Sequence, residues 1–314
     1  ALIKKSVPAN NRRKAAKGGK KSTPLKIISL GGLDEIGKNM TVYEYGSDIF
    51  IIDCGMTFPD AEMPGVDIVI PDFSYVVKNA DRVKGLVITH GHEDHIGGIP
   101  YLLKVLNCPV YATKLTVGLI EGKLREHGLL SKAKLNIVKP GDSVTLGCFK
   151  AEFIHVNHSI PDSVAVAVKT PIGVIVHTGD FKIDSTPIDG KMIDFARFSE
   201  LGRKGVLALL MDSTNATRPG FTMSERTVGA SLSHKDAGGK RIVVATFSSN
   251  IHRVQQIVDE AVKCGRKVAV SGRSMINVVT IATELGYLKI PKGVLIDIDL
   301  IKNYTDDKLV IITT

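Results

Sequence analysis

Aromatic residues are scarce in this chain of 314 residues, which has no tryptophan and an aromatic share of only 5%. Proteins that bind single-stranded nucleic acid by base stacking depend on exposed aromatic side chains. We therefore expect stacking to be a minor part of any nucleic-acid binding, and phosphate contacts to be the larger part. The chain also lacks an apolar run long enough to cross a bilayer and the apolar core of a signal peptide, so we expect no membrane association.

Cysteine is equally sparse. The four cysteines, Cys54, Cys108, Cys148 and Cys264, lie far apart and form no CxxC pair. This spacing argues against a disulfide framework and against a zinc knuckle. We expect all four to be small buried side chains in a reducing compartment, which predicts a cytoplasmic protein.

Positive charge is in excess, with 41 basic against 32 acidic residues. Eight of the basic residues lie in residues 1–23, which contain no acidic residue, so the other 33 face 32 acidic ones. Residues 1–23 are predicted to be a disordered basic tail, because Gly, Ala, Ser and Pro separate the charges and no core can form. Such a tail is either a solubilising leader or a weak, salt-sensitive RNA arm; its lysine bias disfavours a transit peptide.

The most informative stretch is Thr89-His90-Gly91-His92-Glu93-Asp94-His95, in which three histidines and an aspartate fall within six residues. It follows the apolar residues 86–88 and precedes two glycines, a pattern typical of a buried strand that ends in a tight loop and opens a helix. On an extended segment His90 and His92 project to the same side. Imidazole and carboxylate together suit a catalytic zinc site. A chance surface cluster is the alternative, and it fits this spacing poorly.

The HxHxDH pattern after an apolar strand resembles the metallo-β-lactamase superfamily. Further motifs resemble the ribonuclease J family of β-CASP nucleases, from about residue 25 to the last residue. HxHxDH alone indicates only the superfamily, whereas the ordered set is much more specific. The set comprises GGLDEIGKN (31–39), HSIPDS (158–163), HTGDFK (177–182), DSTN (212–215), TMSER (222–226), ATFSSNIHR (245–253) and GRSM (272–275).

The resemblance implies an α/β protein, a metallo-β-lactamase αβ/βα sandwich with an inserted, incomplete β-CASP domain of parallel βαβ type. The pattern along the chain agrees, because strands alternate with helices at 252–264 and 275–285 in the second part. We predict a disordered tail at 1–23, a metallo-β-lactamase domain at 24–212 and a partial β-CASP domain at 213–314. Family members continue with two further histidine motifs, so we expect a chain truncated at its C-terminus.

The resemblance also implies two metal ions per active site, zinc by preference, with manganese as the alternative. The first ion would be held by three histidines and the second by a histidine and an aspartate, with a further aspartate bridging both. The six implied ligands are His90, His92 and His158 for the first ion, Asp94 and His95 for the second, and Asp180 between them.

Other residues near this site have implied supporting roles. Asp53 ends an apolar strand and would orient a ligand histidine from behind. His155 is expected to be structural. His177 either lies in the core, which we favour, or supports a metal ligand from behind. Asp212 either supports the site or delivers a proton to the leaving group, and a strand-end cap is the alternative; Leu209 and Met211, just before it, are expected to be core. The predicted catalytic residues are Asp94, Asp180 and Asp212.

Two turns in the second part carry polar side chains. Ser248, Ser249 and Asn250 precede one predicted helix, and Arg273 and Ser274 precede the next. Parallel strands share the sheet edge at which ligands bind, so both turns are expected to face one site. N–H groups at a helix start and a guanidinium are suited to phosphate, and the resemblance implies that this region binds RNA phosphates, including a 5′-monophosphate. Ordinary helix capping by serine or asparagine is the alternative.

The resemblance implies a metal-dependent ribonuclease with 5′→3′ exonuclease activity and endonuclease capacity, acting in RNA processing and decay. A hydroxide bridging two metal ions would hydrolyse the phosphodiester in line and leave a 5′-phosphate on the downstream product. The expected partner is single-stranded RNA, together with a homo-oligomer or an RNA-decay complex. The alternatives are a DNA-processing β-CASP nuclease and a catalytically incomplete RNA-binding fragment.

Overall fold

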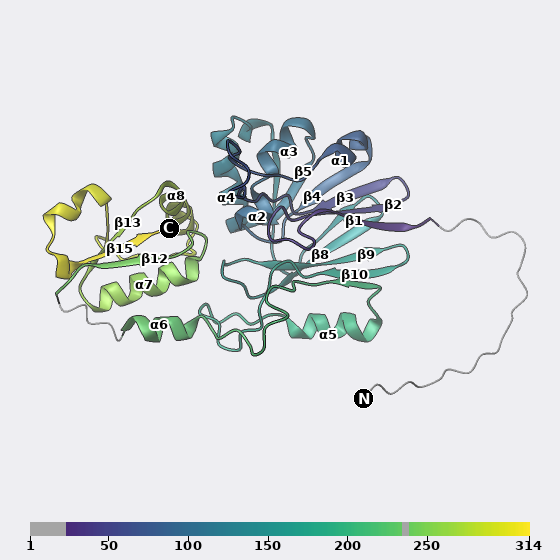
Figure 1. Cartoon of the computed structure of the whole chain (residues 1–314). Helices are drawn as coiled ribbons and strands as arrows, with labels where there is room; N and C mark the ends of the chain where they lie inside the picture. The colour runs from purple at the N-terminus through teal and green to yellow at the C-terminus, as the bar shows by residue number, and fades with distance from the viewer. Residues whose placement is uncertain (1–22, 234–238) are drawn as a thin grey trace, which may run out of the picture.

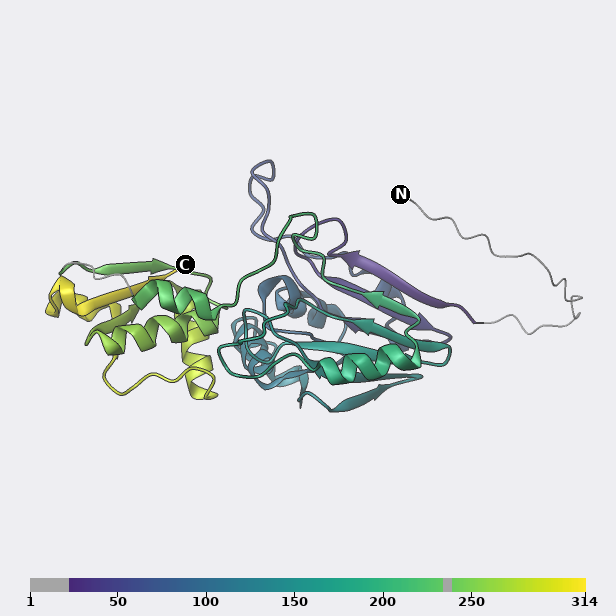
Figure 2. The ribbon, with the colours of Figure 1, turned by 90° about the horizontal axis from the view of Figure 1, so that it is seen from below.

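The computed structural model describes residues 23–233 and 239–314, so the predicted basic tail lies outside the described residues except for its last position. The described chain forms two units (Figure 1). The first unit is a sandwich of two sheets with helices on both outer faces. The second unit is a smaller parallel sheet with its own helices, and a segment without regular structure connects the two (Figure 2).

The first sheet has six strands in the order β1-β2-β3-β4-β5-β6. β1, β2 and β3 are antiparallel neighbours, whereas β3 to β6 run parallel. Four helices cover its outer face (Figure 1). The strands are β1 (Leu25–Gly31), β2 (Met40–Tyr45), β3 (Asp48–Ile52), β4 (Val83–Val87), β5 (Pro109–Thr113) and β6 (Lys134–Val138), and the helices are α1 (Ser74–Lys78), α2 (Glu93–Ile96), α3 (Ile99–Val105) and α4 (Lys114–Glu126).

The second sheet has five strands in the order β11-β10-β9-β8-β7 and packs against the first. Strands β7 to β10 form an antiparallel meander, and β11 adds to the edge in parallel with β10. Helix α5 (Phe195–Lys204) covers the outer face (Figure 1). The strands are β7 (Ser143–Leu146), β8 (Phe149–His155), β9 (Val164–Thr170), β10 (Gly173–His177) and β11 (Ala208–Leu210).

The third sheet, in the second unit, is entirely parallel and has the order β12-β15-β13-β14. Strand β15 therefore lies between β12 and β13, and the turns that follow those two strands open at the same edge. The elements are β12 (Ile242–Ala245), β13 (Lys267–Val270), β14 (Leu295–Ile296) and β15 (Leu309–Thr313), with helices α6 (Arg226–Ser233), α7 (Ile251–Lys263) and α8 (Arg273–Glu284). Short 3-10 turns lie at η1 (Ala80–Arg82), η2 (Leu130–Lys132), η3 (Ile298–Asn303) and η4 (Asp306–Lys308).

Three clusters of buried side chains hold the layers together. Large aromatic residues, among them Tyr43, Phe50 and Phe149, fill the space between the first two sheets. A smaller cluster lies under α5. The third cluster runs from α3 and α4 into the second unit, where it includes side chains of α7 and α8. Apolar packing is thus continuous from one unit to the other.

The αβ/βα sandwich and the parallel βαβ character of the second unit were both predicted correctly. The burial of all four cysteines was not. Cys54 and Cys108 are buried, but Cys148 and Cys264 are exposed. Cys148 lies in the turn between β7 and β8, and Cys264 follows the last residue of α7. At both positions the chain turns at the protein surface.

The expectation that Leu209 and Met211 are core is also wrong, because each is 57% exposed. Strand β11 is a three-residue edge strand, and successive side chains of a strand point to opposite faces. Ala208 and Leu210 pack against the core between the sheets. Leu209 and Met211 therefore face outward. Among the described residues no helix combines the length and apolar character that crossing a membrane would require.

Candidate metal centre

The histidine motif lies on the loop between β4 and α2, at the edge of the first sheet. Backbone bonds join the motif to two segments: after β3, the N–H of Cys54 donates to the carbonyl of His95 at 2.9 Å, and before β2, the N–H of Asn39 donates to the carbonyl of Asp94 at 3.0 Å. Gly55 permits this close approach, since a Cβ there would lie 1.5 Å from the Asp94 carbonyl oxygen. The position of the loop is therefore set by backbone packing.

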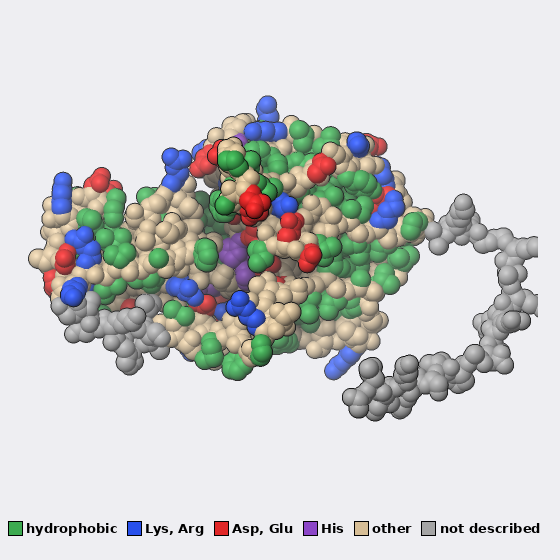
Figure 3. Space-filling view, in the orientation of Figure 1, with side chains coloured by type: hydrophobic (Ala, Val, Ile, Leu, Met, Phe, Trp, Pro, Cys, Tyr) green, Lys and Arg blue, Asp and Glu red, His purple; other side chains and the backbone are tan. Residues whose placement is uncertain are grey.

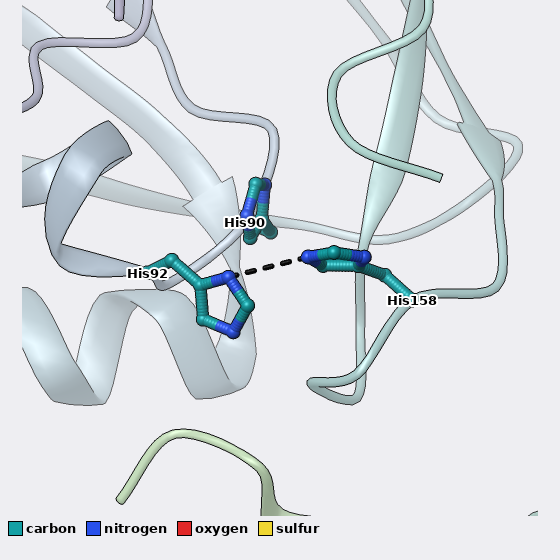
Figure 4. Close-up of side chains that lie close together, drawn as sticks. All are labelled: His90, His92 and His158. Atoms are coloured by element: carbon teal, nitrogen blue, oxygen red, sulfur yellow. Dashed lines mark hydrogen bonds between the residues drawn. The ribbon is translucent and has the colours of Figure 1, made fainter. Parts of the chain in front are cut away.

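His90, His92 and His158 come together as one group of nitrogen donors (Figure 4). Their ligand atoms all lie within 4.8 Å of one another. Nε2 of His158 lies 3.2 Å from Nδ1 of His92. His158 reaches the motif from the segment after β8, so the two sheets of the sandwich both contribute to the group. These are the three residues that the sequence assigned to the first ion.

A second group consists of His90, His95 and Asp180. Oδ1 of Asp180 lies 3.4 Å from Nε2 of His95, and its Oδ2 lies 3.8 Å from Nε2 of His158. Asp180 therefore lies between the two groups, where a bridging carboxylate is expected. The segment after β10 carries it to this position.

Asp94 lies beside the second group but is not a member of it. Its Oδ2 is 3.6 Å from Nε2 of His95 and 3.3 Å from Nδ2 of Asn39. Asn39 also lies 3.1 Å from Nε2 of His95. The structure thus places Asp94 at the rim of the centre, held by an asparagine that the candidate list did not include.

A buried network behind the histidines sets their orientation. Nδ1 of His95 lies 2.8 Å from Oδ2 of Asp53. The hydroxyl of Thr89 donates to the same carboxylate at 2.8 Å and lies 3.0 Å from Nδ1 of His90. The Thr89 hydroxyl has one proton and donates it to Asp53, so it accepts a hydrogen bond from Nδ1–H of His90. Nε2 of His90 is then the nitrogen with the free lone pair. Asp53 thus occupies the place predicted for a residue that orients a ligand histidine.

The buried nitrogen Nε2 of His90 has no hydrogen-bond partner among the described residues. An unpaired buried polar atom costs free energy comparable to a lost hydrogen bond, so an atom of this kind points to a missing ligand. His90 is the residue that the two groups have in common. This orphaned nitrogen and the oriented imidazoles fit a metal-binding role.

Burial keeps the histidines of the first group neutral. It lowers the pKa of His90 well below the usual range, and neighbouring histidines add to the effect. It lowers the pKa of His92 to about 3 and that of His158 to about 4. Neutral imidazole is the form that binds metal ions, so the first group is ready to bind a cation at neutral pH.

The second group is electrostatically different. Burial lowers the pKa of His95, but the carboxylates of Asp53 and Asp180 outweigh it and raise the pKa well above the usual range. Burial raises the pKa of Asp180, but His95 and the other histidines lower it far below the usual range. Burial raises the pKa of Asp94. The negative charge of Asp180 therefore attracts a cation between the two groups.

A cavity of about 360 Å³ opens next to the second group, lined by Asn39, Asp53, His95, Asp180 and Asp212 among others. Histidine side chains are visible in a hollow between the two units in the space-filling view (Figure 3). Oδ1 of Asp212 accepts from the N–H of Thr214 at 2.8 Å, which is the strand-end cap named as its alternative role. Asp212 both caps the turn and faces the cavity.

The two remaining histidines of the region make contacts outside the groups. Nδ1 of His177 lies 2.8 Å from the hydroxyl of Tyr43 in the core, and Nε2 of His155 lies 3.4 Å from the carbonyl of Lys191. Sequence reasoning missed Thr89 and left Asn39 off the candidate list. Thr89 directly precedes His90 and Asn39 ends the GGLDEIGKN motif, so their place in these motifs was the available signal.

The polar turns of the second unit meet at a separate cavity of about 510 Å³. Ser248, Ser249, Arg273 and Ser274 line it, together with Glu93 and other residues of the first unit. The hydroxyls of Ser248 and Ser274 are 2.8 Å apart, so the two turns lie side by side as predicted. Asn250 is not at the cavity.

The role that the structure shows for Asn250 is the alternative one. Its side chain accepts from the N–H of Arg253 and caps α7. Arg253 itself binds both carboxylate oxygens of Glu225 at 3.0 Å. Both residues thus have structural contacts within the second unit.

Two family models match the chain. A model described as "Metallo-beta-lactamase superfamily" matches residues 33–203, and one described as "Ribonuclease J, beta-CASP domain" matches residues 239–314. Together they cover most of the described residues of both units.

Curated proteins and a solved structure are also similar. The chain is 48% identical to "Ribonuclease J" of Synechocystis sp., covering 92% of this chain and 46% of that protein. It is 45% identical to "Ribonuclease J2" of Bacillus subtilis, covering 94% of this chain and 53% of that protein. The chain thus spans about half the length of these relatives. A protein of unknown function from Enterococcus faecalis V583 shares the fold with a TM-score of 0.64 at 15% identity, over 93% of this chain and 77% of that one.

Proposed function

Because the chain belongs to the metallo-β-lactamase superfamily and carries a ribonuclease J β-CASP segment, we propose that it acts as a metal-dependent ribonuclease. The observation that carries the proposal is the pair of donor groups that share His90, a buried histidine whose Nε2 has no hydrogen-bond partner among the described residues. The second group lies beside the cavity of about 360 Å³ that Asp180 and Asp212 line. The proposed reaction is hydrolysis of RNA phosphodiesters, 5′→3′ from the end and also internally.

His90, His92 and His158 would hold one ion, His95 and the adjacent Asp94 would hold the other, and Asp180 would lie between the two. Bound cations supply Lewis acidity, which lowers the pKa of water and offsets negative charge on a phosphodiester. We propose zinc, because most donors are imidazole nitrogens, and manganese as the alternative that the carboxylates permit.

The chain's own residues orient the histidines and hold the acidic side chains in place. Thr89 and Asp53 fix the Nδ1 side of His90 and His95, so that Nε2 of each faces the centre. Asn39 holds Asp94 at the rim. Asp212 faces the cavity and would deliver a proton to the leaving oxygen, or support the group that does. No covalent bond between the protein and RNA is required.

The second unit would hold the substrate by its phosphates. Ser248, Ser249 and Ser274 offer hydroxyls, and Arg273 offers a planar guanidinium suited to a phosphate group. Since Glu93 of the metal loop lines the same cavity, RNA bound there would continue toward the metal centre. We propose that this cavity receives a 5′-monophosphate. Asn250 supports it indirectly by capping α7.

The domain boundary follows from the same proposal. We place the metallo-β-lactamase domain at 24–212 and the β-CASP segment at 213–314, since the turn at Asp212 ends the last strand of the sandwich. A cytoplasmic location and assembly into a homo-oligomer or an RNA-decay complex accompany the proposed function.

The test is digestion of internally labelled RNA with a 5′-monophosphate, alongside DNA of the same sequence, with added zinc or manganese and a chelator control. Chelator-sensitive release of 5′-mononucleotides from RNA alone is the expected result. Preferential digestion of DNA would identify a DNA-processing nuclease instead. Absence of cleavage by folded, metal-loaded protein would contradict the activity and leave an RNA-binding fragment.

A further inference from the structure

Helix α8 connects the phosphate cavity with the loop that carries His158. Its first residues, Arg273 and Ser274, line the cavity. The chain just beyond its last residue reaches the first unit again, at the 158–163 loop. A helix of 12 residues is about 18 Å long and behaves as a rigid rod. Helix α8 and the residues just after it therefore contact two distant parts of the proposed site, the phosphate cavity and the loop that carries His158.

The side of α8 packs closely against α4 of the first unit, at a place where α4 has no side chains. A Cβ on Gly118 would lie 2.9 Å from Cδ1 of Leu285 and 3.0 Å from Cγ2 of Ile281. A Cβ on Gly122, one turn later, would lie 3.6 Å from Cδ1 of Ile281. Nζ of Lys114 donates to the carbonyl of Leu285 at 3.4 Å. The end of α8 is thus seated against α4.

Tyr287 extends this contact to the metal centre. Its hydroxyl donates to the carboxylate of Asp162, which also accepts from the N–H of Leu115 at 3.4 Å. The carbonyl of Asp162 accepts from the hydroxyl of Thr113 at 3.0 Å. Asp162 has a φ of +66°, a left-handed conformation that aspartate adopts more readily than most residues other than glycine. It lies four residues after His158 in the same loop.

We propose that Tyr287 is a positioning residue: by binding Asp162 it holds α8 against α4 and the His158 loop, and so fixes the separation of the phosphate cavity and the metal centre. The proposal rests on the proposed function, because the separation matters only if one RNA chain occupies both places. It assigns Tyr287 no contact with substrate. The bond joins residues 125 positions apart in the chain, one in each unit.

The first test measures the separation of the two units directly. Fluorescent dyes on the exposed thiols Cys148 and Cys264 report the distance between the units, since Cys54 and Cys108 are buried. Single-molecule energy transfer is compared for the parent, Tyr287→Phe and Tyr304→Phe. Tyr287→Phe is expected to broaden or shift the distance distribution. Tyr304→Phe removes a hydroxyl elsewhere in the second unit and is expected to leave the distribution unchanged.

The second test separates positioning from general damage. Hydrolysis of 5′-monophosphorylated RNA requires both places, whereas bis(p-nitrophenyl) phosphate requires only the metal centre. We expect Tyr287→Phe to lower kcat/KM for RNA about tenfold, the effect of losing one hydrogen bond to a charged group, with the small diester changed less than about twofold. An equal fall for both substrates would mean a merely structural role and overturn the proposal.

The outcomes distinguish this inference from the function on which it rests. An unchanged distance distribution in Tyr287→Phe overturns the inference whatever the activity. A changed distribution in a protein that hydrolyses the small diester but not RNA supports the link between the units while contradicting the proposed ribonuclease. A changed distribution with selective loss of RNA hydrolysis supports both.

Discussion

The metal centre and the phosphate cavity differ in whether contacts within the protein account for their polar side chains. At the metal centre, buried histidines are oriented from behind by Asp53 and Thr89, and a nitrogen of His90 is left without a partner. At the phosphate cavity, Arg273 and Ser274 are exposed and Ser248 and Ser249 are half-buried, while the neighbouring Asn250 caps a helix. Buried polar atoms cost free energy unless a ligand satisfies them, whereas exposed ones cost little. The first region therefore makes the stronger functional argument.

The largest expected effect comes from Asp94→Ala. Losing this carboxylate should lower RNA hydrolysis on the order of a thousandfold, because it removes charge from the second group. The fold should survive, since the loop is held through the backbone of Asp94. Hydrolysis and thermal unfolding are measured together, with Asp81→Ala as a control of equal charge change. Parent-like cleavage by Asp94→Ala would refute the two-metal mechanism.

Gly55→Ala tests the backbone packing that positions the metal loop. The added Cβ would overlap the Asp94 carbonyl, so we expect a loss of about 3 kcal/mol in the free energy of unfolding. Gly202→Ala is the matched control: it lies within α5 with open space around it, and should be neutral or add up to about 1 kcal/mol. Urea unfolding measures both. Equal stability of the two variants would show that the close approach is not required.

Asp53→Asn tests the orientation of His95 and needs no activity assay. The carboxylate accepts on both oxygens, from the N–H of Thr89 on Oδ1 and from the Thr89 hydroxyl and His95 on Oδ2. An amide has only one acceptor oxygen, so its NH2 group must face one of these donors, and metal affinity should fall roughly 10- to 100-fold. Competition with a chromophoric chelator measures the affinity. Asp48→Asn, at the other end of β3, should lower stability without changing metal affinity, because Asp48 binds the N–H of Cys148 instead. If both variants bind metal like the parent, Asp53 is only structural.

Arg273→Ala tests the weaker side of the comparison. We expect about a tenfold loss of preference for 5′-monophosphorylated over 5′-hydroxyl RNA, with internal cleavage little changed. Arg203→Ala, an equal loss of charge at the end of α5, is the control. An unchanged preference would place the 5′-phosphate outside this cavity and leave the turns with capping roles only.

The smallest expected effect concerns Glu44, a buried carboxylate that other side chains of the protein bind, so that it needs no ligand. Burial raises the pKa of Glu44, but bonds from Tyr75, Lys26 and Arg82 lower it to about 2, against an ordinary value of 4.5. A lowered folded-state pKa means that Glu44 stabilises the protein above about pH 4.5, and that this contribution disappears as the pH falls toward 2. Glu44→Gln should cost about 1 kcal/mol at pH 7 and almost nothing at pH 2. A cost independent of pH would contradict this account.

Much of the metal centre was predictable because its ligands are local. His90, His92, Asp94 and His95 lie in one motif, and the strand and helix around it have clear patterns. Helix α5 was not predicted, although Asp194 caps its start and Gly205 follows its end. Helix α6 gave a weaker signal, since Thr, Gly and Ser are poor helix formers.

Contacts between distant residues could not be predicted from the sequence. The bond from Tyr287 to Asp162 depends on how one unit packs on the other, and no local pattern encodes that. The exposure of Leu209 depends on β11 being an edge strand, which only the sheet order reveals. For Asn250 the local pattern allowed both capping and phosphate binding, and the structure shows capping.

The central claim is that two cations bind at the groups sharing His90, and anomalous X-ray scattering at the zinc edge tests it most directly. Crystals of the zinc-loaded protein should give two peaks, one among His90, His92 and His158 and one beside His95 and Asp180. A single peak, or peaks only elsewhere on the molecule, would contradict the two-metal centre and with it the proposed mechanism.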